Sequence, residues 1–401
     1  MDHPTANTVL WPRPVEVKRP LRVAHLLPNL LVGGRERIVN LLSQEGERLG
    51  LTSLLIGYDP PPSQAAVLVP AAPYIQLDRR KADFADQLCA VLRSHAIDVV
   101  HAQGHIPACY LASALAHMPD APSSFATMHV GLSGTRRWLW PIRRALRAMD
   151  GLSAVSKNMA RTYSILSGRP VPVLTNGIDP QGLALNVSEW PPEKSPFQFA
   201  MLSRLARAKR HVDAIMAADR LVASGYVLEL HIAGEGECLA ELTALAETRP
   251  WLKLAGTVDP TEFLHGKHGF LLPSAMEGTP LALLEAMAAG LPSIVSNLPS
   301  LRDVAGDATS YVAVSATTDL AKAMERLVSD PHHWKALSLA ARRRAQDFDI
   351  RKISEHYRAY YDQVLERKAV GPTNTFGRRS ATKSIDAPGM CFQKINGMTQ
   401  Q

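Results

Sequence analysis

Short apolar runs alternate with helical stretches along most of the chain, and the alternation starts afresh once, near its middle. In the first half these runs are Leu21–Leu27, Thr52–Ile56, Asp98–His101, Ser124–His129 and Leu152–Ser156. In the second half they are Phe197–Leu202, Val227–Ala233, Leu252–Ala255, Gly269–Pro273 and Pro292–Ser296. Apolar strands separated by helices predict a parallel sheet with helices on both faces. The fold class is therefore α/β, with two successive Rossmann-like domains.

The interruption between the two series predicts the domain boundaries. The 181–196 segment contains Trp190-Pro191-Pro192 and shows no periodicity, which indicates a linker. A chain of 401 residues is long enough for two domains with full cores. The expected divisions are a flexible leader (1–20), an N-terminal domain (21–180), the linker, a C-terminal domain (197–350), a helix that packs back on the N-terminal domain (351–367) and a disordered tail (368–401).

Composition restricts the partners and the compartment. The net charge of +7 and the pI near 9.3 favour anionic partners, such as nucleoside diphosphates or an acidic membrane surface. The four cysteines are scattered without metal-ligand spacing, which suggests reduced thiols. The start of the sequence lacks the apolar core of a signal peptide, and no run approaches about 18 apolar residues. We therefore expect a cytoplasmic protein that could lie only on a membrane surface.

The most informative stretch runs from Glu277 to Pro292 (EGTPLALLEAMAAGLP). Pro280 suits the first turn of a helix, and Gly290 suits its C-terminal end. Glu277 then lies in the loop between a strand and this helix. In open α/β sheets, ligands bind at such loops, beyond the carboxyl ends of the strands.

This loop and helix offer two kinds of polar group. The backbone amides of Gly278 and Thr279, together with the helix dipole, favour anions and hydroxyl groups. Glu285 lies within a helix that is otherwise apolar, and a buried carboxylate requires partners. Hydroxyl groups of a sugar or a ribose would suit it. The alternative is a glutamate at the helix start and a second, solvated one.

A second stretch, Ser203–Lys209 (SRLARAK), follows the first strand of the C-terminal series. Arg204 and Lys209 could both face a diphosphate, the arginine as a fork and the lysine as a point charge. They could neutralise a departing nucleoside diphosphate without a metal ion. The alternative is a solvated basic loop.

A glycine pair, Gly33-Gly34, opens the first helix of the N-terminal series. Paired glycines allow the backbone to approach a phosphate closely. Neither this pair nor Gly234-Glu235-Gly236 completes the G-x-G-x-x-G pattern. The pattern therefore argues against a dinucleotide cofactor.

These stretches together resemble family 4 of the retaining glycosyltransferases, which have the GT-B fold, over about Leu21 to Tyr361. Glu277 and Glu285 match its E-x7-E motif, Arg204 and Lys209 its donor-phosphate cations, and Gly33-Gly34 its N-terminal glycine pair. Further similarities are the turn Asn176–Asp179, the segment Val100–Gln103, where glutamine replaces the second histidine of V-H-x-H, and Thr127–His129, which matches T-x-H.

The resemblance implies two domains that face each other across a cleft. The C-terminal domain would bind a UDP-, GDP- or ADP-sugar, and the N-terminal domain would bind a glycan or lipid-linked acceptor in polysaccharide biosynthesis. The implied catalytic residues are Glu277, Arg204, Lys209 and His129. The implied donor-binding residues are Gly33, Gly34, Arg204, Lys209, Glu277, Gly278, Thr279, Pro280, Leu281 and Glu285. In such enzymes the first glutamate touches the sugar and the second the ribose.

No metal site or cofactor is expected. Asp347-Phe348-Asp349 has the D-x-D spacing of metal-dependent glycosyltransferases, but it lies far in sequence from the donor motifs. We interpret it as a helix cap and a surface charge. The nucleotide sugar is then a substrate rather than a cofactor.

One basic segment, 136–147 (RRWLWPIRRALR), combines five arginines with two tryptophans. Arginine heads beside tryptophan rings suit the headgroup region of an anionic membrane, so the protein could be peripheral on the inner face of the cytoplasmic membrane. The alternative is a surface helix with a buried tryptophan. Basic runs elsewhere lack interleaved aromatic residues, so no nucleic-acid partner is expected.

Two other functions fit the same motifs less completely. A sugar-nucleotide epimerase of the GT-B fold would release an epimerised nucleotide sugar in the absence of any acceptor. A non-catalytic basic protein that binds membranes or nucleic acid would bind none of the nucleotide sugars. A screen of UDP-, GDP- and ADP-sugars separates the binding protein from the two enzymes, and an assay for the epimerised nucleotide sugar without acceptor separates the epimerase from a glycosyltransferase.

We expect sugar transfer to continue in excess EDTA, because the diphosphate position is predicted to carry two cations and no metal cluster. Initial rates with and without EDTA measure this. Complete loss of transfer in EDTA, restored by Mn²⁺ or Mg²⁺, would contradict the prediction.

Overall fold

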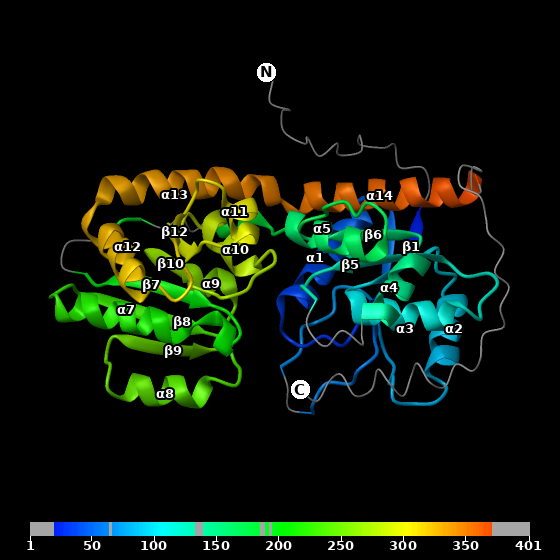
Figure 1. Cartoon of the computed structure of the whole chain (residues 1–401), viewed down its shortest axis with the longest axis horizontal. Helices are drawn as coiled ribbons and strands as arrows, with labels where there is room; N and C mark the ends of the chain where they lie inside the picture. The colour runs from blue at the N-terminus through cyan, green and yellow to red at the C-terminus, as the bar shows by residue number, and fades with distance from the viewer. Residues whose placement is uncertain (1–19, 64–65, 133–138, 185–188, 192–194, 371–401) are drawn as a thin grey trace, which may run out of the picture.

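Two parallel sheets, each with helices on both faces, lie side by side in the computed structural model (Figure 1). The structure describes residues 20–63, 66–132, 139–184, 189–191 and 195–370. The expected leader, part of the expected linker and most of the expected tail lie outside these residues. The predicted fold class, α/β with two Rossmann-like domains, is confirmed.

The N-terminal sheet has the strand order β3-β2-β1-β4-β5-β6, six strands within the described residues. Its strands are β1 (Leu21–Leu27), β2 (Leu51–Gly57), β3 (Tyr74–Gln76), β4 (Val99–Ala102), β5 (Ser123–Met128) and β6 (Gly151–Ala154). Its helices are α1 (Gly34–Arg48), α2 (Phe84–Ser94), α3 (His105–Leu115), α4 (Leu139–Ala148), α5 (Lys157–Ser167) and α6 (Pro180–Ala184). Every strand pair in this sheet is parallel.

The C-terminal sheet has the order β12-β11-β10-β7-β8-β9, again six strands among the described residues. Its strands are β7 (Phe197–Leu202), β8 (Leu228–Ala233), β9 (Leu252–Gly256), β10 (Gly269–Leu272), β11 (Ser293–Ser296) and β12 (Ser310–Val312). Its helices are η2 (Arg207–Lys209), α7 (His211–Ala223), α8 (Leu239–Glu247), α9 (Pro260–Leu264), α10 (Leu281–Ala288), α11 (Pro299–Ala305), α12 (Thr317–Ser329), α13 (Pro331–Ala345) and η3 (Gln346–Phe348). The last helix, α14 (Ile350–Val370), returns to the N-terminal domain.

Burial explains why the strands are continuous apolar runs. All four residues of β4 and all four of β10 are buried. Helices cover both faces of a parallel sheet, so a central strand has no solvated side and shows no alternation of polar residues. The α10 helix is buried in the same way, because all but one of its residues are buried.

The chain crosses between the domains twice, and backbone hydrogen bonds join the two crossing segments. The amide of Ile178 donates to Phe348 O (2.9 Å), and the amide of Ile350 donates to Ile178 O (2.8 Å). From there α13 runs over the C-terminal domain and α14 over the N-terminal domain (Figure 1). The two final helices therefore span both domains on the same side of the molecule.

Three local expectations need correction. Pro280 is the residue before α10 rather than part of its first turn. The residues Pro180–Ala184 form α6 and Leu183 is buried, so the beginning of the segment expected to be a linker is packed helix. The last helix starts at Ile350 and continues to Val370, three residues beyond the expected end at Arg367. Within the described residues, no helix is both long and apolar enough to cross a membrane.

A buried polar chain fixes α14 to the N-terminal sheet. The hydroxyl of Tyr361 bonds His101 Nδ1 (2.7 Å), and His101 Nε2 bonds Thr127 Oγ1 (2.7 Å), which in turn meets Ser153 Oγ (2.7 Å). Tyr361 is 2% exposed and His101 is 1% exposed. Burial holds the pKa of His101 well below its usual value, with smaller contributions from His25 and His129, so the imidazole is neutral. The chain therefore joins α14 to β4, β5 and β6.

We expect Tyr361→Phe to lower the free energy of unfolding by about 1–3 kcal/mol, because His101 Nδ1 would stay buried without a partner. Denaturant unfolding measures the change. The control is Tyr226→Phe, whose hydroxyl bonds Glu325 in an exposed pair, and which should change stability by less than about 0.5 kcal/mol. Equal effects of the two substitutions would show that the buried chain does not stabilise the docked helix.

Candidate functional site

The strand order of both sheets places the candidate residues at equivalent positions. In each sheet the first strand lies in the interior, and the chain continues outward on both of its sides: β1 is flanked by β2 and β4, and β7 by β8 and β10. The loops after two such neighbouring strands diverge and open a crevice where ligands bind. Gly33-Gly34 follows β1 and Gln103 follows β4, whereas Arg204–Lys209 follows β7 and Glu277 follows β10. Sequence-predicted donor residues therefore meet at both switch points.

In the C-terminal crevice, Lys209 and Glu277 form an ion pair. Lys209 Nζ lies 2.6 Å from Glu277 Oε1, and the glutamate side chain is 7% exposed. The amide of Ala275 donates to Ala208 O (2.8 Å), so the two loops are also joined through the backbone. Arg204 is exposed, and its side chain forms no hydrogen bond or ion pair with another described residue. The crevice thus presents one paired and one unpaired cation at its mouth.

The second glutamate has a partner that the sequence did not indicate. Glu285, in α10, is 2% exposed, and its Oε1 accepts a hydrogen bond from Arg37 Nη2, on α1 of the other domain. Burial raises the pKa of Glu285, and the Arg37 guanidinium opposes that rise. The second oxygen, Oε2, is buried with no partner among the described residues. Glu285 therefore keeps one acceptor oxygen unused.

The loop before α10 is seated directly on the N-terminal domain. Thr279 Oγ1 donates to Val155 O (2.6 Å), and Asn176 Nδ2 donates to Thr279 O (2.8 Å). A Cβ atom at Gly278 would lie 2.8 Å from Met159 Cε and 3.1 Å from the His129 carbonyl oxygen, so a side chain there would require both neighbours to shift. The amides of Gly278 and Thr279 donate to no other described residue. This contact brings His129 against the donor loop.

His129 belongs to a short polar chain at the carboxyl end of the N-terminal sheet. Its Nε2 donates to Gln103 Oε1 (2.8 Å), and Gln103 Nε2 donates to His25 Nδ1 (3.0 Å). Because an amide oxygen only accepts, His129 carries its hydrogen on Nε2, and Nδ1 is a buried acceptor without a partner in the described chain. Burial first, and then the charge of Arg35, lower the pKa of His129 to about 3. The imidazole is neutral at physiological pH.

The remaining predicted donor residues lie along the same junction. A Cβ atom at Gly34 would lie 4.0 Å from Leu281 in α10, so the glycine pair faces the donor helix across the domain interface. The Glu36 carboxylate lies close to Gly33: a Cβ atom at Gly33 would be 2.6 Å from Glu36 Oε2. Gly290 ends α10 with φ +75°, a conformation that favours glycine.

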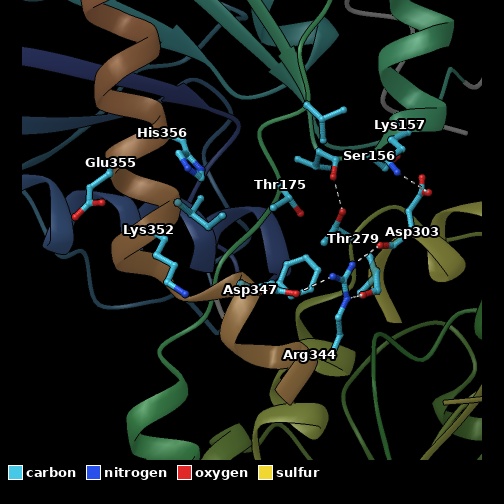
Figure 2. Close-up of a pocket in the computed structure, with 15 residues that line it drawn as sticks. Ser156, Lys157, Thr175, Thr279, Asp303, Arg344, Asp347, Lys352, Glu355 and His356 are labelled. Carbon is cyan, nitrogen blue, oxygen red and sulfur yellow. Dashed lines mark hydrogen bonds and ion pairs between the residues drawn. The ribbon is translucent and has the colours of Figure 1, made fainter. Parts of the chain in front are cut away.

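A cavity of about 430 Å³ lies between the domains (Figure 2). Its walls include Ser156 and Lys157 at the start of α5, Arg344 from α13 and His356 from α14. Thr279 is the only predicted donor residue that lines it, within the described residues. Lys157 pairs with Asp303 (3.8 Å), and Arg344 pairs with Asp347 (2.7 Å). Two cations of this cavity are therefore paired with neighbouring carboxylates, and the cavity shares Thr279 with the loop before α10.

A second cavity, of about 230 Å³, lies in the N-terminal domain. It is lined by Pro28, Arg35, Tyr58, Asp59, Arg79, Gln103, Gly104, His105, Ile106, Pro107, Tyr110, His129 and Val130. These residues come from the loops after β1, β2, β3, β4 and β5, from Arg35 in the first turn of α1, and from the first two turns of α3. It includes two residues of the polar chain described above, Gln103 and His129.

The acidic residues of the D-x-D spacing serve local structure. Asp349 Oδ1 accepts from the amide of Arg351 (2.9 Å) at the start of α14, and Asp347 pairs with Arg344. In the described part of the chain, no three histidine, cysteine or carboxylate side chains gather as metal ligands.

Sequence reasoning missed Arg37, Arg35 and Arg79. Arg37 lies three positions beyond Gly34, in the first turn of α1, so its proximity to the glycine pair was a usable signal. Its partner, however, is 248 positions further along the chain. The sequence marked Gln103 only as a replacement for a histidine. Its contact with His129 exists because β4 and β5, which precede the two residues, are neighbours in the sheet.

Family models match both halves of the chain. Residues 32–181 match the model described as Glycosyltransferase Family 4, and residues 186–344 match Glycosyl transferases group 1. Among curated proteins, the chain is similar to the glycogen synthase of Mycobacterium tuberculosis, with 30% identity over 293 residues, 65% of this chain and 68% of the relative. It is also similar to the alpha-maltose-1-phosphate synthase of Mycolicibacterium smegmatis, with 26% identity over 56% of this chain and 66% of the relative.

Solved structures share the fold at low sequence identity. The sucrose-phosphate synthase of Thermosynechococcus elongatus has a TM-score of 0.71 at 16% identity, covering 86% of this chain and 99% of that one. The Anabaena protein Alr3699/HepE in complex with UDP-glucose has a TM-score of 0.69 at 15% identity, covering 87% and 100%. At these identities the likeness establishes the arrangement of the two domains.

We expect Arg37→Ala to lower the free energy of unfolding by about 1–3 kcal/mol at pH 8, because the buried Glu285 carboxylate loses its counter-ion. The pKa of Glu285 is raised in the folded protein, so this cost is present above that pKa and disappears as the carboxyl takes up a proton at lower pH. The loss should therefore be smaller at pH 5. Denaturant unfolding at both pH values measures it.

Arg48→Ala is the matched control, because Arg48 lies on the same helix and its pair with Glu355 is exposed. A second substitution, Glu285→Gln in the Arg37→Ala background, should restore stability at pH 8. A loss from Arg37→Ala that is equal at both pH values would exclude a role for the glutamate charge.

Proposed function

The chain belongs to family 4 of the glycosyltransferases, and on that premise we propose that it transfers a sugar, with retention at the anomeric carbon, from a nucleoside diphosphate to a glycan or lipid-linked acceptor. The observation that carries the proposal is the crevice between β7 and β10, where Arg204, Lys209 and Glu277 meet opposite His129. Chain topology, charge and the contact between the domains all converge there.

Arg204 and Lys209 stabilise the leaving diphosphate. The bond from the anomeric carbon to the phosphate oxygen breaks, the acceptor oxygen bonds the same face of that carbon, and the acceptor proton passes to a phosphate oxygen. Negative charge develops on the diphosphate, and fixed cations are most effective there. Lys209 already pairs with Glu277, so the bound donor must share or replace that contact.

Glu277 and His129 hold the transferred sugar. The Glu277 carboxylate, with the unused amides of Gly278 and Thr279, offers acceptors and donors for sugar hydroxyls. His129 has a pKa lowered to about 3, so it is a hydrogen-bonding group rather than an acid–base catalyst. The proton therefore goes to the phosphate rather than to this histidine.

Glu285 accepts hydrogen bonds from the ribose. Its Oε2 is buried and without a partner, and Arg37 holds Oε1 and favours the ionised form. A carboxylate with one fixed and one available oxygen is a suitable acceptor for a ribose hydroxyl.

The relatives support a nucleotide sugar and a saccharide acceptor. One relative is named as a UDP-galactose transferase of Escherichia coli that acts on a diphosphoundecaprenol-linked sugar, with 30% identity over 142 residues. Structural neighbours contain UDP, UDP-glucose or ADP. We accordingly propose a UDP-, GDP- or ADP-sugar as donor, catalysis without a metal ion, and a role in bacterial polysaccharide biosynthesis.

The basic segment 136–147 supports a cytoplasmic protein that is peripheral on the membrane. Residues 136–138 lie outside the described part of the chain. In α4, Trp140 is 68% exposed, so a surface helix with a buried tryptophan does not describe this residue. Arg143, Arg144 and Arg147 are also exposed, and the Arg144 guanidinium lies 5.8 Å from the Trp140 ring centre. Exposed arginines beside an exposed tryptophan suit an anionic membrane surface.

We expect Glu285→Ala to weaken nucleotide-sugar binding by about tenfold, the equivalent of 1.4 kcal/mol. Glu277→Ala should chiefly lower kcat, by about 10²-fold, because it contacts the sugar at the reacting centre. Titration with UDP-, GDP- and ADP-sugars, followed by transfer rates with the one that binds, measures both. The matched control is Glu262→Ala, an exposed glutamate on α9. Wild-type behaviour of both site variants would refute the assignment.

We expect the protein to sediment with anionic vesicles at low salt and to be released as salt rises. Each arginine near such a surface contributes about 1 kcal/mol, and the Debye length falls from about 10 Å at 0.1 M salt to about 3 Å at 1 M. Changing Arg136, Arg137, Arg143 and Arg144 together to serine should abolish sedimentation.

The control for this experiment removes four exposed cations from the C-terminal domain, Lys322, Arg326, Lys335 and Arg343, by the same change to serine. The control protein should still sediment. Equal sedimentation of the two variants would assign the attraction to net charge rather than to this segment.

A further inference from the structure

The 230 Å³ cavity of the N-terminal domain contains charged groups that the donor chemistry does not use. It opens at the switch point of the N-terminal sheet, between the loop after β1, at Pro28, and the loop after β4, at Gln103. This position corresponds to the donor crevice in the other domain. In open parallel sheets such a position is where ligands bind.

The cavity lies beside the donor site. His129 is one of its lining residues, and the carbonyl oxygen of the same residue lies against Gly278. Arg35, on its other side, directly follows Gly34, which faces Leu281 in the donor helix. A molecule in this cavity is therefore next to the position proposed for the transferred sugar.

Two arginines and one carboxylate line the cavity. Arg79 is 5% exposed; its Nη1 donates to the Tyr110 hydroxyl (3.1 Å), and its Nε lies 3.5 Å from Asp59 Oδ1. Arg35 is held by the neighbouring Glu36, through Nε to Oε1 (2.8 Å), outside the cavity lining. Two guanidinium groups and one carboxylate thus line the cavity, and Arg79 is almost fully buried.

The histidines of the cavity add no positive charge of their own, but they report on the local potential. Burial lowers the pKa of His105 to about 4 and that of His129 to about 3, and the charge of Arg35 is the second cause in both. The Arg35 guanidinium therefore lies close enough to act electrostatically on both imidazoles, so its charge reaches into the cavity. An anion in the same space would gain from it.

The start of α3 adds backbone donors. Gly104 precedes this 11-residue helix without a side-chain cap, and the first turn has no acidic residue. The amides of His105 and Ile106 donate to no other described residue, and both residues line the cavity. Helix N-termini attract anions through these amides and the helix dipole, and arginine forks match phosphate oxygens.

We infer that this cavity binds a phosphate group carried by the acceptor, with Arg79 and Arg35 as its counter-ions and the α3 amides as further donors. The inference rests on the proposed function for the identity of the ligand as acceptor. It restricts the acceptor to molecules with a phosphate close to the hydroxyl that receives the sugar. That phosphate can belong to a soluble sugar phosphate or to a lipid-linked one.

Calorimetric titration of the full chain with inorganic phosphate, glucose 1-phosphate and a polyprenyl phosphate in micelles tests the cavity. The titrations are done in an Arg204→Ala, Lys209→Ala background, which removes the donor-phosphate cations. We expect at least one phosphate ligand to bind, and Arg79→Gln or Arg35→Gln to weaken it at least tenfold. Arg93→Gln, an exposed arginine paired with Asp120 on the same domain, should leave it unchanged. The ligand that binds tightest identifies a soluble or a lipid source.

Two results would overturn the inference: phosphate binding that is lost in the Arg204, Lys209 background alone, or binding that persists in both cavity variants. Because Arg79 is buried, its variant is checked by thermal unfolding, and the half-buried Arg35 supplies the independent test. In the wild-type background, Arg35→Gln should raise KM for a phosphorylated acceptor at least tenfold and leave the donor Kd unchanged. Failure of sugar transfer with intact Arg35-dependent phosphate binding would reject the proposed function but not the phosphate site.

Discussion

The rest of the site depends on the contact between the loop before α10, Glu277–Pro280, and the N-terminal domain. Thr279 is bonded through its side chain to Val155 O and through its carbonyl oxygen to Asn176, and Gly278 lies close to Met159 and to the His129 carbonyl oxygen. These contacts fix the loop before α10 against the other domain. They bring Glu277 opposite His129 and Glu285 within reach of Arg37. A site assembled this way requires both domains to be in place.

Charge pairing within the site sets a cost for ligand binding. Glu277 is paired with Lys209 inside one domain, and Glu285 with Arg37 across the interface. A buried carboxylate is tolerated only with such a partner. A donor that takes over hydrogen bonds from these groups must offset the loss of the existing pairs. Arg204 is exposed and forms no hydrogen bond or ion pair with another described residue, so it is available to meet the diphosphate of the proposed donor first.

The two sheets have the same strand topology, but their crevices carry different polar groups. The C-terminal crevice presents two carboxylates, two cations and free amides, as the hydroxyls and phosphates of a nucleotide sugar require. The N-terminal crevice presents neutral histidines, which burial and Arg35 keep uncharged, beside two arginines. A neutral His129 next to the proposed sugar position avoids a second cation competing for the leaving phosphate.

The fold class and the alternation of strands with helices could be predicted from the sequence, and so could the position of the proposed donor residues on loops that follow β1, β7 and β10. Those features are local: apolar runs mark buried strands, and the spacing from Glu277 to Glu285 is set within one loop and one helix. Only the tertiary structure decided that Arg37 bonds Glu285, that Gln103 sets the tautomer of His129, and that Arg79 reaches the same cavity as Arg35. Each of these contacts joins residues on different elements, and the strand order, rather than the distance along the chain, brings them together. The sequence around a long polar side chain does not indicate its partner, because the conformation of that side chain depends on the residues of the element packed opposite it.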